Sequence, residues 1–251
     1  MRWNGTAWKR VPSPSPVRGL LFSVAATSAR NAWAVGATGA RSLILRWNGT
    51  VWKRVPSPGG QLTGVAALSA RSAWAVGTTA AGRTLILRWS GTAWKRVPSP
   101  TPKGGGLLLR VAVVSARSAW AVGFTAGGRA LIVRWNGTVW KRVPGPTLGT
   151  ASLWGVTATS ARSAWAVGAT GPLPLGACGS INSAARTASK TVILRWNGTV
   201  WKRVRSPKPY AGLLVGVAAA SARSAWAVGQ TGSSLLNSKT LTVRWNGTAW
   251  K

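Results

Sequence analysis

The feature that most limits the fold of this chain is an internal repeat. The pentapeptide Arg-Trp-(Asn/Ser)-Gly-Thr occurs six times, with its tryptophan at positions 3, 47, 89, 135, 196 and 245. A second block, Ala-Trp-Ala-Val-Gly, occurs five times, with its tryptophan at positions 33, 74, 120, 165 and 226, shortly after a Ser-Ala-Arg tripeptide. Successive units are 42 to 61 residues apart. A period of this size is typical of folds in which one supersecondary unit stacks on the next.

Each unit divides into four short segments. In the unit from Gly64 to Pro100 they are GVAALS, AWAVG, TLILRW and AWKRVPSP. The segments are only about five to eight residues long and are separated by glycine and proline, which favours strands over helices. They are also rich in tryptophan, valine, isoleucine and threonine, which are common in strands. The sequence therefore predicts an all-β fold, a β-propeller of four-stranded antiparallel blades.

The repeat positions predict one domain, residues 1–251, with about five blades plus an extra N-terminal hairpin. The hairpin is expected at 1–14 and the blades at approximately 17–58, 61–100, 105–146, 150–207 and 211–251. The fourth blade contains an insertion, 171–190, that is expected to form a longer loop with Cys178 exposed. Because the chain starts and stops within the same motif, two interpretations stay open: a segment of a longer array, or two hairpins that form an incomplete sixth blade. Either leaves an unpaired strand edge that favours self-association.

An Asn-Gly dipeptide joins the third and fourth segments and predicts a two-residue type I′ turn. In the first complete unit this register pairs Trp47 with Thr50 and Leu45 with Trp52. Side chains alternate along a strand, so the hairpin is expected to have two distinct faces. One face holds Leu43, Leu45, Trp47 and Trp52, and the other holds Ile44, Arg46, Val51 and Lys53.

Tryptophan is unusually abundant, with 18 residues, and all but Trp154 lie in the two repeated blocks. Large aromatic side chains dominate protein cores, so we expect these residues to pack between blades. The alternative is that exposed indoles stack on sugars or bases, but binding residues lie more often on variable loops than at regular positions. The expected structural set is Trp33, Trp47, Trp52, Trp74, Trp89, Trp94, Trp120, Trp135, Trp140, Trp165, Trp196, Trp201 and Trp226.

The charge composition is extreme, with 33 lysines and arginines, no aspartate, glutamate or histidine, and a formal net charge of +33. The usual general acids and bases, carboxylate ligands and sets of zinc ligands are absent, which predicts a protein that is not an enzyme and uses no cofactor or metal. Five of the six Arg-Trp-(Asn/Ser)-Gly-Thr repeats continue into a Lys-Arg pair, so a propeller would carry a band of positive charge. The candidate polyanion-binding residues are Lys9, Arg10, Lys53, Arg54, Lys95, Arg96, Lys141, Arg142, Lys202 and Arg203.

The unit SARSAWAVG…LILRWNGTxWKRVPSP resembles tryptophan-rich propeller repeats of secreted and cell-surface bacterial proteins. More distantly it resembles the Asp-box repeats of sialidases and the blades of photosystem II assembly-factor-type propellers. The resemblance covers essentially the whole chain and implies a propeller located outside the cell or at its surface. The first residues, MRWNGTAWKRVPSP, contain no apolar segment typical of a signal peptide, and no apolar run has the length of a membrane span. Asn48 and Ser90 stand where an Asp box has aspartate, and sialidase chemistry is not implied.

The leading interpretation is a non-enzymatic binding or scaffold module. Its partner would be an anionic polymer, such as a cell-wall polyanion or nucleic acid, or another protein. Two alternatives stay open: a carbohydrate-binding lectin that uses exposed tryptophans, and an assembly factor for a protein complex. Quenching of tryptophan fluorescence by neutral sugars would indicate the lectin, whereas a steep salt dependence would indicate polyanion binding.

The composition predicts how stability responds to salt and pH. No acidic side chain is present to pair with the 33 basic ones, so like charges repel and added salt screens that repulsion. We expect the melting temperature to rise from low to moderate ionic strength and to stay nearly constant between about pH 4.5 and 7, where no side chain of this chain ordinarily titrates. Calorimetry at several salt concentrations tests this, and a melting temperature that falls with salt would contradict it.

Overall fold

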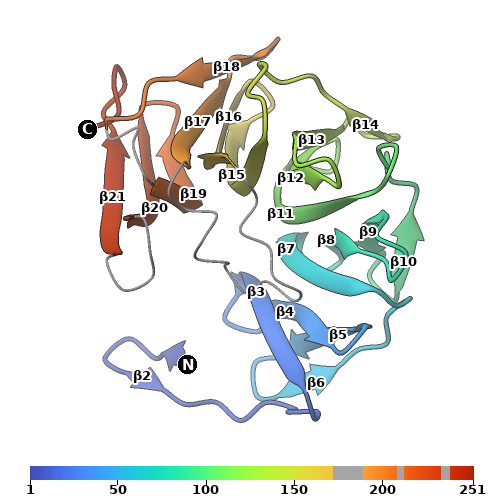
Figure 1. The fold of residues 1–251 in the computed structure, drawn as a ribbon. Helices are drawn as coiled ribbons and strands as arrows, with labels where there is room; N and C mark the ends of the chain where they lie inside the picture. Colours follow the sequence, from blue (N-terminus) through green and yellow to red (C-terminus); the bar gives the residue numbers. More distant parts are fainter. Residues whose placement is uncertain (172–188, 208–211, 233–237) are drawn as a thin grey trace.

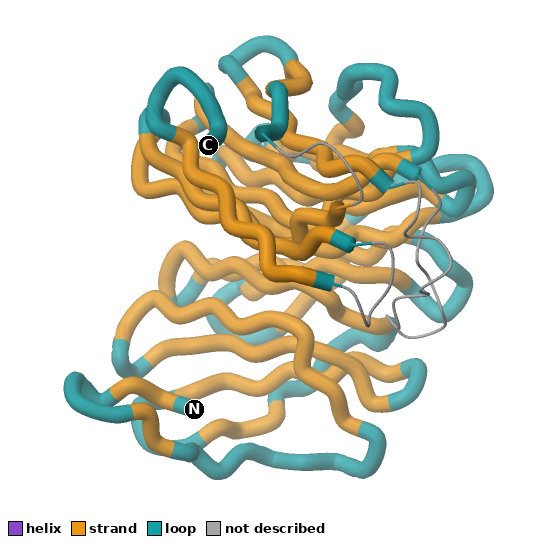
Figure 2. The backbone as a smooth tube through the Cα atoms, turned by 60° about the vertical axis from the view of Figure 1, so that its left-hand side comes forward, coloured by secondary structure: helices purple, strands orange, loops and turns teal. Residues whose placement is uncertain are grey.

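The computed structural model confirms the all-β propeller and describes residues 1–171, 189–207, 212–232 and 238–251. Within these residues every regular element is a strand, and the sheets stand around a ring with their first strands toward its centre (Figure 1). The strands run between two sets of loops, which gather at opposite ends of the ring (Figure 2). The insertion that contains Cys178 lies almost entirely outside the described residues.

Four blades have four antiparallel strands each, ordered from the inside outward as they occur in the chain. Blades one and two are β3 (Gly19–Ser28), β4 (Asn31–Thr38), β5 (Arg41–Trp47) and β6 (Trp52–Arg54), then β7 (Gln61–Ser69), β8 (Ser72–Thr78), β9 (Thr84–Trp89) and β10 (Trp94–Val97). Blades three and four are β11 (Gly106–Ser115), β12 (Ser118–Thr125), β13 (Ala130–Trp135) and β14 (Trp140–Arg142), then β15 (Ala151–Ser160), β16 (Ser163–Thr170), β17 (Lys190–Trp196) and β18 (Trp201–Val204).

The two ends of the chain form smaller sheets. Blade five consists of β19 (Gly212–Ser221), β20 (Ser224–Thr231) and β21 (Lys239–Trp245), and a single bridge between Trp245 and Trp250 stands in place of a fourth strand. The N-terminal hairpin pairs β1 (Arg2–Trp3) with β2 (Trp8–Lys9). Figure 1 shows this hairpin at the open part of the ring, between blade one and blade five.

The hairpin register predicted from Asn-Gly is wrong by two positions. Trp47 pairs with Trp52 instead of Thr50, and Leu45 pairs with Arg54. A shift of two residues preserves the alternation of side chains, so the two faces expected for strand residues are as predicted. Leu43 and Leu45 pack with Trp52 on one face, and Ile44 lies on the other.

The turn has four residues because an asparagine side chain replaces a backbone acceptor. Asn48 Oδ1 accepts hydrogen bonds from the backbone N–H groups of Thr50 and Val51, both at 2.9 Å. Gly49 alone in this turn has a positive φ, 104°, whereas a type I′ turn needs two such residues. Val51 therefore lies in the turn and not on the strand face where it was expected.

The glycine of each Ala-Trp-Ala-Val-Gly block is required by a close approach of two strands. The first strand of every blade has a bulge, which in blade two falls between Leu62 and Gly64. A Cβ atom added to Gly77 would lie against the carbonyl oxygen of Gln61. The equivalent glycines meet a carbonyl oxygen of the first strand in the same way: Gly36, Gly123, Gly168 and Gly229.

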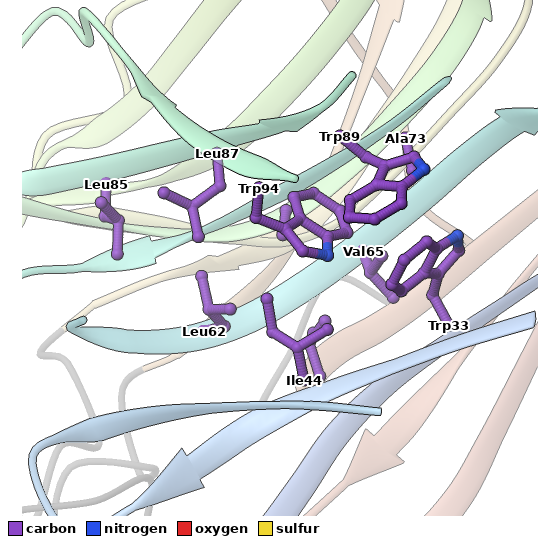
Figure 3. Packing of buried hydrophobic residues seen from close by; sticks show 11 residues of the cluster. Trp33, Ile44, Leu62, Val65, Ala73, Leu85, Leu87, Trp89 and Trp94 are labelled. Carbon is purple, nitrogen blue, oxygen red and sulfur yellow. The ribbon is translucent and has the colours of Figure 1, made fainter. Parts of the chain in front are cut away.

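Three tryptophans and one arginine join each blade to the next, and we call this arrangement the seam. Trp33 of blade one is fully buried, with its ring centroid 4.8 Å from that of Trp89 and 5.1 Å from that of Trp94 in blade two (Figure 3). The guanidinium of Arg46 lies 5.1 Å from the Trp33 ring and 5.2 Å from the Trp89 ring. The same seam recurs with Trp74, Trp135, Trp140 and Arg88, with Trp120, Trp196, Trp201 and Arg134, and with Trp165, Trp245, Trp250 and Arg195.

One backbone carbonyl completes the seam. The indole Nε1 of Trp89 donates to the carbonyl oxygen of Ala70 at 3.1 Å, and Arg46 Nη2 donates to the same oxygen at 3.3 Å. Arg46 Nη2 also donates to Asn31 Oδ1 at 3.4 Å. The chain has no acidic side chain, so two aromatic faces and these oxygens take the place of a carboxylate partner. A cation–π contact of this kind is worth about 0.5 to 2 kcal/mol.

A comparison of two tryptophans tests the seam. Trp120→Ala removes a fully buried ring from a complete seam and should lower the free energy of unfolding by about 3–5 kcal/mol. Trp226→Ala, in blade five, changes a side chain that is 48% exposed and should cost less than about 1 kcal/mol. Denaturant titrations measure both values. Equal losses would show that the seam does not carry the stability assigned to it.

The close strand approach gives a second test. Gly77→Ala forces the first two strands of blade two apart and should cost about 3 kcal/mol or more. Gly127→Ala is the control, because the nearest atom to its added Cβ would be 3.8 Å away and its backbone is not in the left-handed region. Thermal melts of the two variants compare them directly. A Gly77 variant as stable as the Gly127 variant would refute the steric requirement.

Candidate anion-binding surface

The repeated Lys-Arg pairs lie at the outer edge of the ring. Lys53 and Arg54 are on β6, the outermost strand of blade one, and both side chains are exposed. All ten candidate residues are exposed, and they occupy β2, β6, β10, β14, β18 or the residue next to β2. Because each blade repeats the same strand order, the structure distributes these pairs around the rim at equivalent positions.

A second set of arginines extends the basic surface, and the sequence prediction did not include it among the candidates. Arg30 lies in the turn between β3 and β4, where Ser28 Oγ accepts a hydrogen bond from its backbone N–H at 3.2 Å. Alternate turns of an antiparallel sheet lie at the same end, and a Cβ placed on Gly49 would be 3.0 Å from Arg30 Cγ. The signal in the sequence was the Ser-Ala-Arg tripeptide, whose arginines are all exposed: Arg30, Arg71, Arg117, Arg162 and Arg223.

Four basic side chains converge on a surface hollow of blade one. Its volume is about 460 Å³, and it is lined by Arg30, Arg46, Lys53 and Arg54 together with Asn48 and Val55. The lining contains no negative group. Guanidinium groups bind phosphate, sulfate and carboxylate groups through paired hydrogen bonds, and lysine adds a point charge. The hollow therefore has the chemistry of an anion site.

Two further hollows lie at the opposite end of the blades, and each has two arginines. One is lined by Arg41, Arg54 and the segment 55–59, and has a volume of about 620 Å³. Its counterpart between blades three and four is lined by Arg129, Arg142 and the segment 144–149, and has a volume of about 510 Å³. Arg54 lines the hollows at both ends of blade one, so the outer strand β6 connects the two hollows.

One arginine of the inner strands has a structural role instead. Arg110 Nη1, on β11, donates to the backbone oxygens of Thr63 at 2.8 Å and Leu109 at 2.9 Å. Burial lowers the pKa of this guanidinium below its ordinary value, although an arginine still keeps its charge near neutral pH. Both hydrogen bonds are made within the wall formed by blades two and three, so Arg110 does not belong to the rim.

The tryptophans are buried in the blades with a few informative exceptions. Of the thirteen expected structural tryptophans, Trp52 is half-buried and Trp226 is exposed. Trp226 departs from the expectation because no further blade packs on its side of blade five. Trp3 and Trp8 of the N-terminal hairpin are also exposed. Trp3 and Trp8 belong to the N-terminal hairpin, Trp52 to blade one and Trp226 to blade five, and these elements border the open part of the ring (Figure 1).

The described residues contain no group of three or more histidine, cysteine, aspartate or glutamate side chains that could hold a metal ion. Cys178 and Tyr210 lie outside the described residues. In the part of the chain that the structure covers, no helix has the length and apolar character needed to cross a membrane.

Comparison with known proteins shows the fold. No family model matches the chain, and no curated protein matches its sequence. A GH74 enzyme from Niastella koreensis superposes with a TM-score of 0.62 at 12% identity, over 92% of this chain and 38% of that one. A lectin from Aleuria aurantia, solved with a fucose-containing disaccharide, gives 0.60 at 11% identity over 94% and 79%. YCF48 from Cyanidioschyzon merolae gives 0.54 at 16% identity over 98% and 88%.

These structures include an enzyme and a lectin, and all are less than 25% identical to this chain. The chain spans less than half the length of the GH74 enzyme. The likeness therefore establishes the propeller architecture. The biochemical role has to be argued from the residues of the rim, since one fold supports many functions.

Proposed function

We propose that this protein is a non-enzymatic binding module that holds an anionic polymer along its basic rim. The observation that carries the proposal is the set of ten exposed lysines and arginines on equivalent outer strands, in a chain with no acidic side chain. The N-terminal hairpin and blades one to four each add one Lys-Arg pair, so a flexible polyanion contacts several of these pairs at once. Release of its counterions supplies most of the binding free energy.

The hollow of blade one suggests how a single charged group would be held. Arg30, Arg46, Lys53 and Arg54 surround a space large enough for one phosphate or sulfate group with its neighbouring atoms. Asn48 can contribute to an anion only as a donor through Nδ2, because its Oδ1 already accepts two backbone hydrogen bonds. Binding of this kind recognises charge and spacing and does not read bases or sugar identity.

A lectin is the second candidate, and one observation favours it. Trp3, Trp8 and Trp226 expose their rings, and exposed indoles stack on sugar faces. The fold likeness to the Aleuria aurantia lectin adds only the architecture at 11% identity. Neutral sugars distinguish the two candidates, because they carry no charge for the rim to bind.

The test is binding to polyphosphate, heparin, DNA and neutral dextran, each titrated with salt. The variant changes Lys53, Lys95, Lys141 and Lys202 to glutamine. The control changes Arg18, Arg83, Lys103 and Lys239, which are exposed near the opposite ends of the blades and line none of the hollows described above. Both variants lose four charges. We expect the rim variant to bind polyphosphate about tenfold more weakly and with a salt slope reduced by about 3, and the control to change less than about threefold.

Two results would contradict the proposal. Equal losses in the two variants would mean that net charge alone, and not the rim, determines binding. Saturable binding of a neutral sugar, with Trp3→Ala or Trp226→Ala weakening it, would favour the lectin instead. The two outcomes are separable because the first changes with salt and the second does not.

A further inference from the structure

A pair of hydroxyl groups joins the third strand to the end of the fourth in blades one, two and four, at the end opposite the Asn-Gly turns. In blade one Ser42 Oγ lies 2.7 Å from Ser57 Oγ. The same pair recurs in the other two blades, at 2.8 Å each: Thr84 with Ser99 and Thr191 with Ser206. The member of each pair on the third strand is buried, so the pair closes this end of the blade.

Blade three has no hydroxyl group at either of these two positions. The strand pairing places Ala130 of β13 where blade one has Ser42. Gly145 takes the place of Ser57, because each lies two residues after a valine whose N–H donates to the third strand. Ala130 is half-buried and Gly145 is exposed, whereas Ser42 is buried. This end of blade three is therefore open.

A hollow with an apolar lining lies where the pair is missing. Its volume is about 510 Å³, and its lining includes Leu194, a fully buried side chain on β17 of blade four. Ala130, Ile132, Leu148 and two prolines form the rest of its apolar part. Ile132, Leu148 and Leu194 all belong to, or pack against, the hydrophobic cluster that joins blades three and four. The hollow is thus an opening into the core between two blades.

Two arginines, Arg129 and Arg142, stand beside this apolar lining, and both are exposed. The backbone of Arg129 is fixed by a turn, since its N–H donates to Thr125 Oγ1 at 3.1 Å and its carbonyl oxygen accepts from the Thr125 N–H at 2.8 Å. Arg142 lies on β14 and pairs with Val133. The chain has no acidic side chain that could neutralise these two guanidinium groups. Such a site suits a ligand with a carboxylate at one end and an apolar group at the other.

The equivalent hollow of blade one has the same two charges without the apolar lining. It is lined by Arg41 and Arg54, the counterparts of the two arginines in blade three, and by both members of the hydroxyl pair, Ser42 and Ser57. Its other lining residues are Val55, two prolines and a glycine, all of which precede the first strand of blade two. A small inorganic anion therefore fits both hollows, whereas an anion with an apolar body fits only the hollow of blade three.

We propose that the hollow between blades three and four is a binding site for a small organic carboxylate with an apolar body, such as a benzoate. The carboxylate accepts hydrogen bonds from the guanidinium groups of Arg129 and Arg142. The apolar body lies beside Leu148 and Leu194, where its surface is removed from water. The volume of about 510 Å³ is in the range of small-molecule pockets. This site goes beyond the proposed function, because the rim recognises charge alone.

The test is a titration of the full chain with 4-(trifluoromethyl)benzoate, followed by fluorine NMR at moderate salt. We expect saturable binding at one site. Trifluoroacetate has the charge without the ring, and 4-(trifluoromethyl)benzamide has the ring without the charge. Each should bind at least about tenfold more weakly than the benzoate. Equal binding of the benzoate and trifluoroacetate would mean that net charge alone attracts the anion, and the proposal would be wrong.

A pair of arginine variants locates the site. Arg129→Gln should weaken binding of the benzoate by about tenfold, because a charged hydrogen-bond donor is lost. Arg83→Gln is the control, and it should change binding less than about twofold. Arg83 closes the same turn in blade two through Thr79, is also exposed, and lines none of the hollows described above. Equal weakening by the two variants would contradict the proposal.

A double variant closes the site with the pair that the other blades use. Ala130→Thr with Gly145→Ser copies Thr84 and Ser99 of blade two. Serine fits, because the backbone of Gly145 is not in the left-handed region and an added Cβ would lie 3.4 Å from Ile132 Cδ1. We expect the variant to melt no lower than the unchanged protein and to bind the benzoate at least about tenfold more weakly.

Unchanged binding of the benzoate by a folded double variant would show that the missing hydroxyl pair does not create the site. The ten lysines and arginines of the rim are retained in all of these variants. Polyphosphate binding should therefore stay the same whether or not the benzoate binds, so the two proposals fail independently.

Discussion

A guanidinium held between two indole rings joins every blade of this propeller to the next. In a chain without carboxylates, a half-buried arginine such as Arg46 needs partners, and the faces of Trp33 and Trp89 with the carbonyl of Ala70 provide them. The contact is shielded from solvent by the rings themselves, so salt weakens it less than it weakens repulsion at the surface. The blades are therefore held together by the same type of residue that would otherwise drive them apart.

The sequence was sufficient to predict the repeat architecture, because strand length, glycine and proline positions and alternation are local properties. It did not predict the turn register, because Asn48 bonds the backbone through its side chain and lengthens the loop to four residues. The assignment of Leu45 and Trp52 to one face was nevertheless correct, since a two-residue shift keeps the alternation. The local sequence pattern therefore predicted the face on which each side chain lies more reliably than it predicted which residues pair across the hairpin.

Contacts between blades could not be predicted from the sequence pattern alone. The role of Arg46 could not be told from that of Lys53, because both are basic residues at regular positions on the same face. Their difference arises from the neighbouring blade, which covers Arg46 and leaves Lys53 exposed. The place of the Lys-Arg pairs on the outer strands was predictable because it follows from the repeat alone. The convergence of Arg30 and Arg54 on one hollow was not, because it depends on two turns that lie at the same end of the blade.

The seam also has a consequence for how such a chain changes over generations. Each blade offers a tryptophan and an arginine on one side and a pair of tryptophans on the other, so any blade fits any other in a fixed direction. Recombination that adds or removes one whole unit therefore preserves every remaining contact. The number of blades can therefore change by unequal crossing-over, whereas the order of side chains within a blade cannot change without loss of the seam.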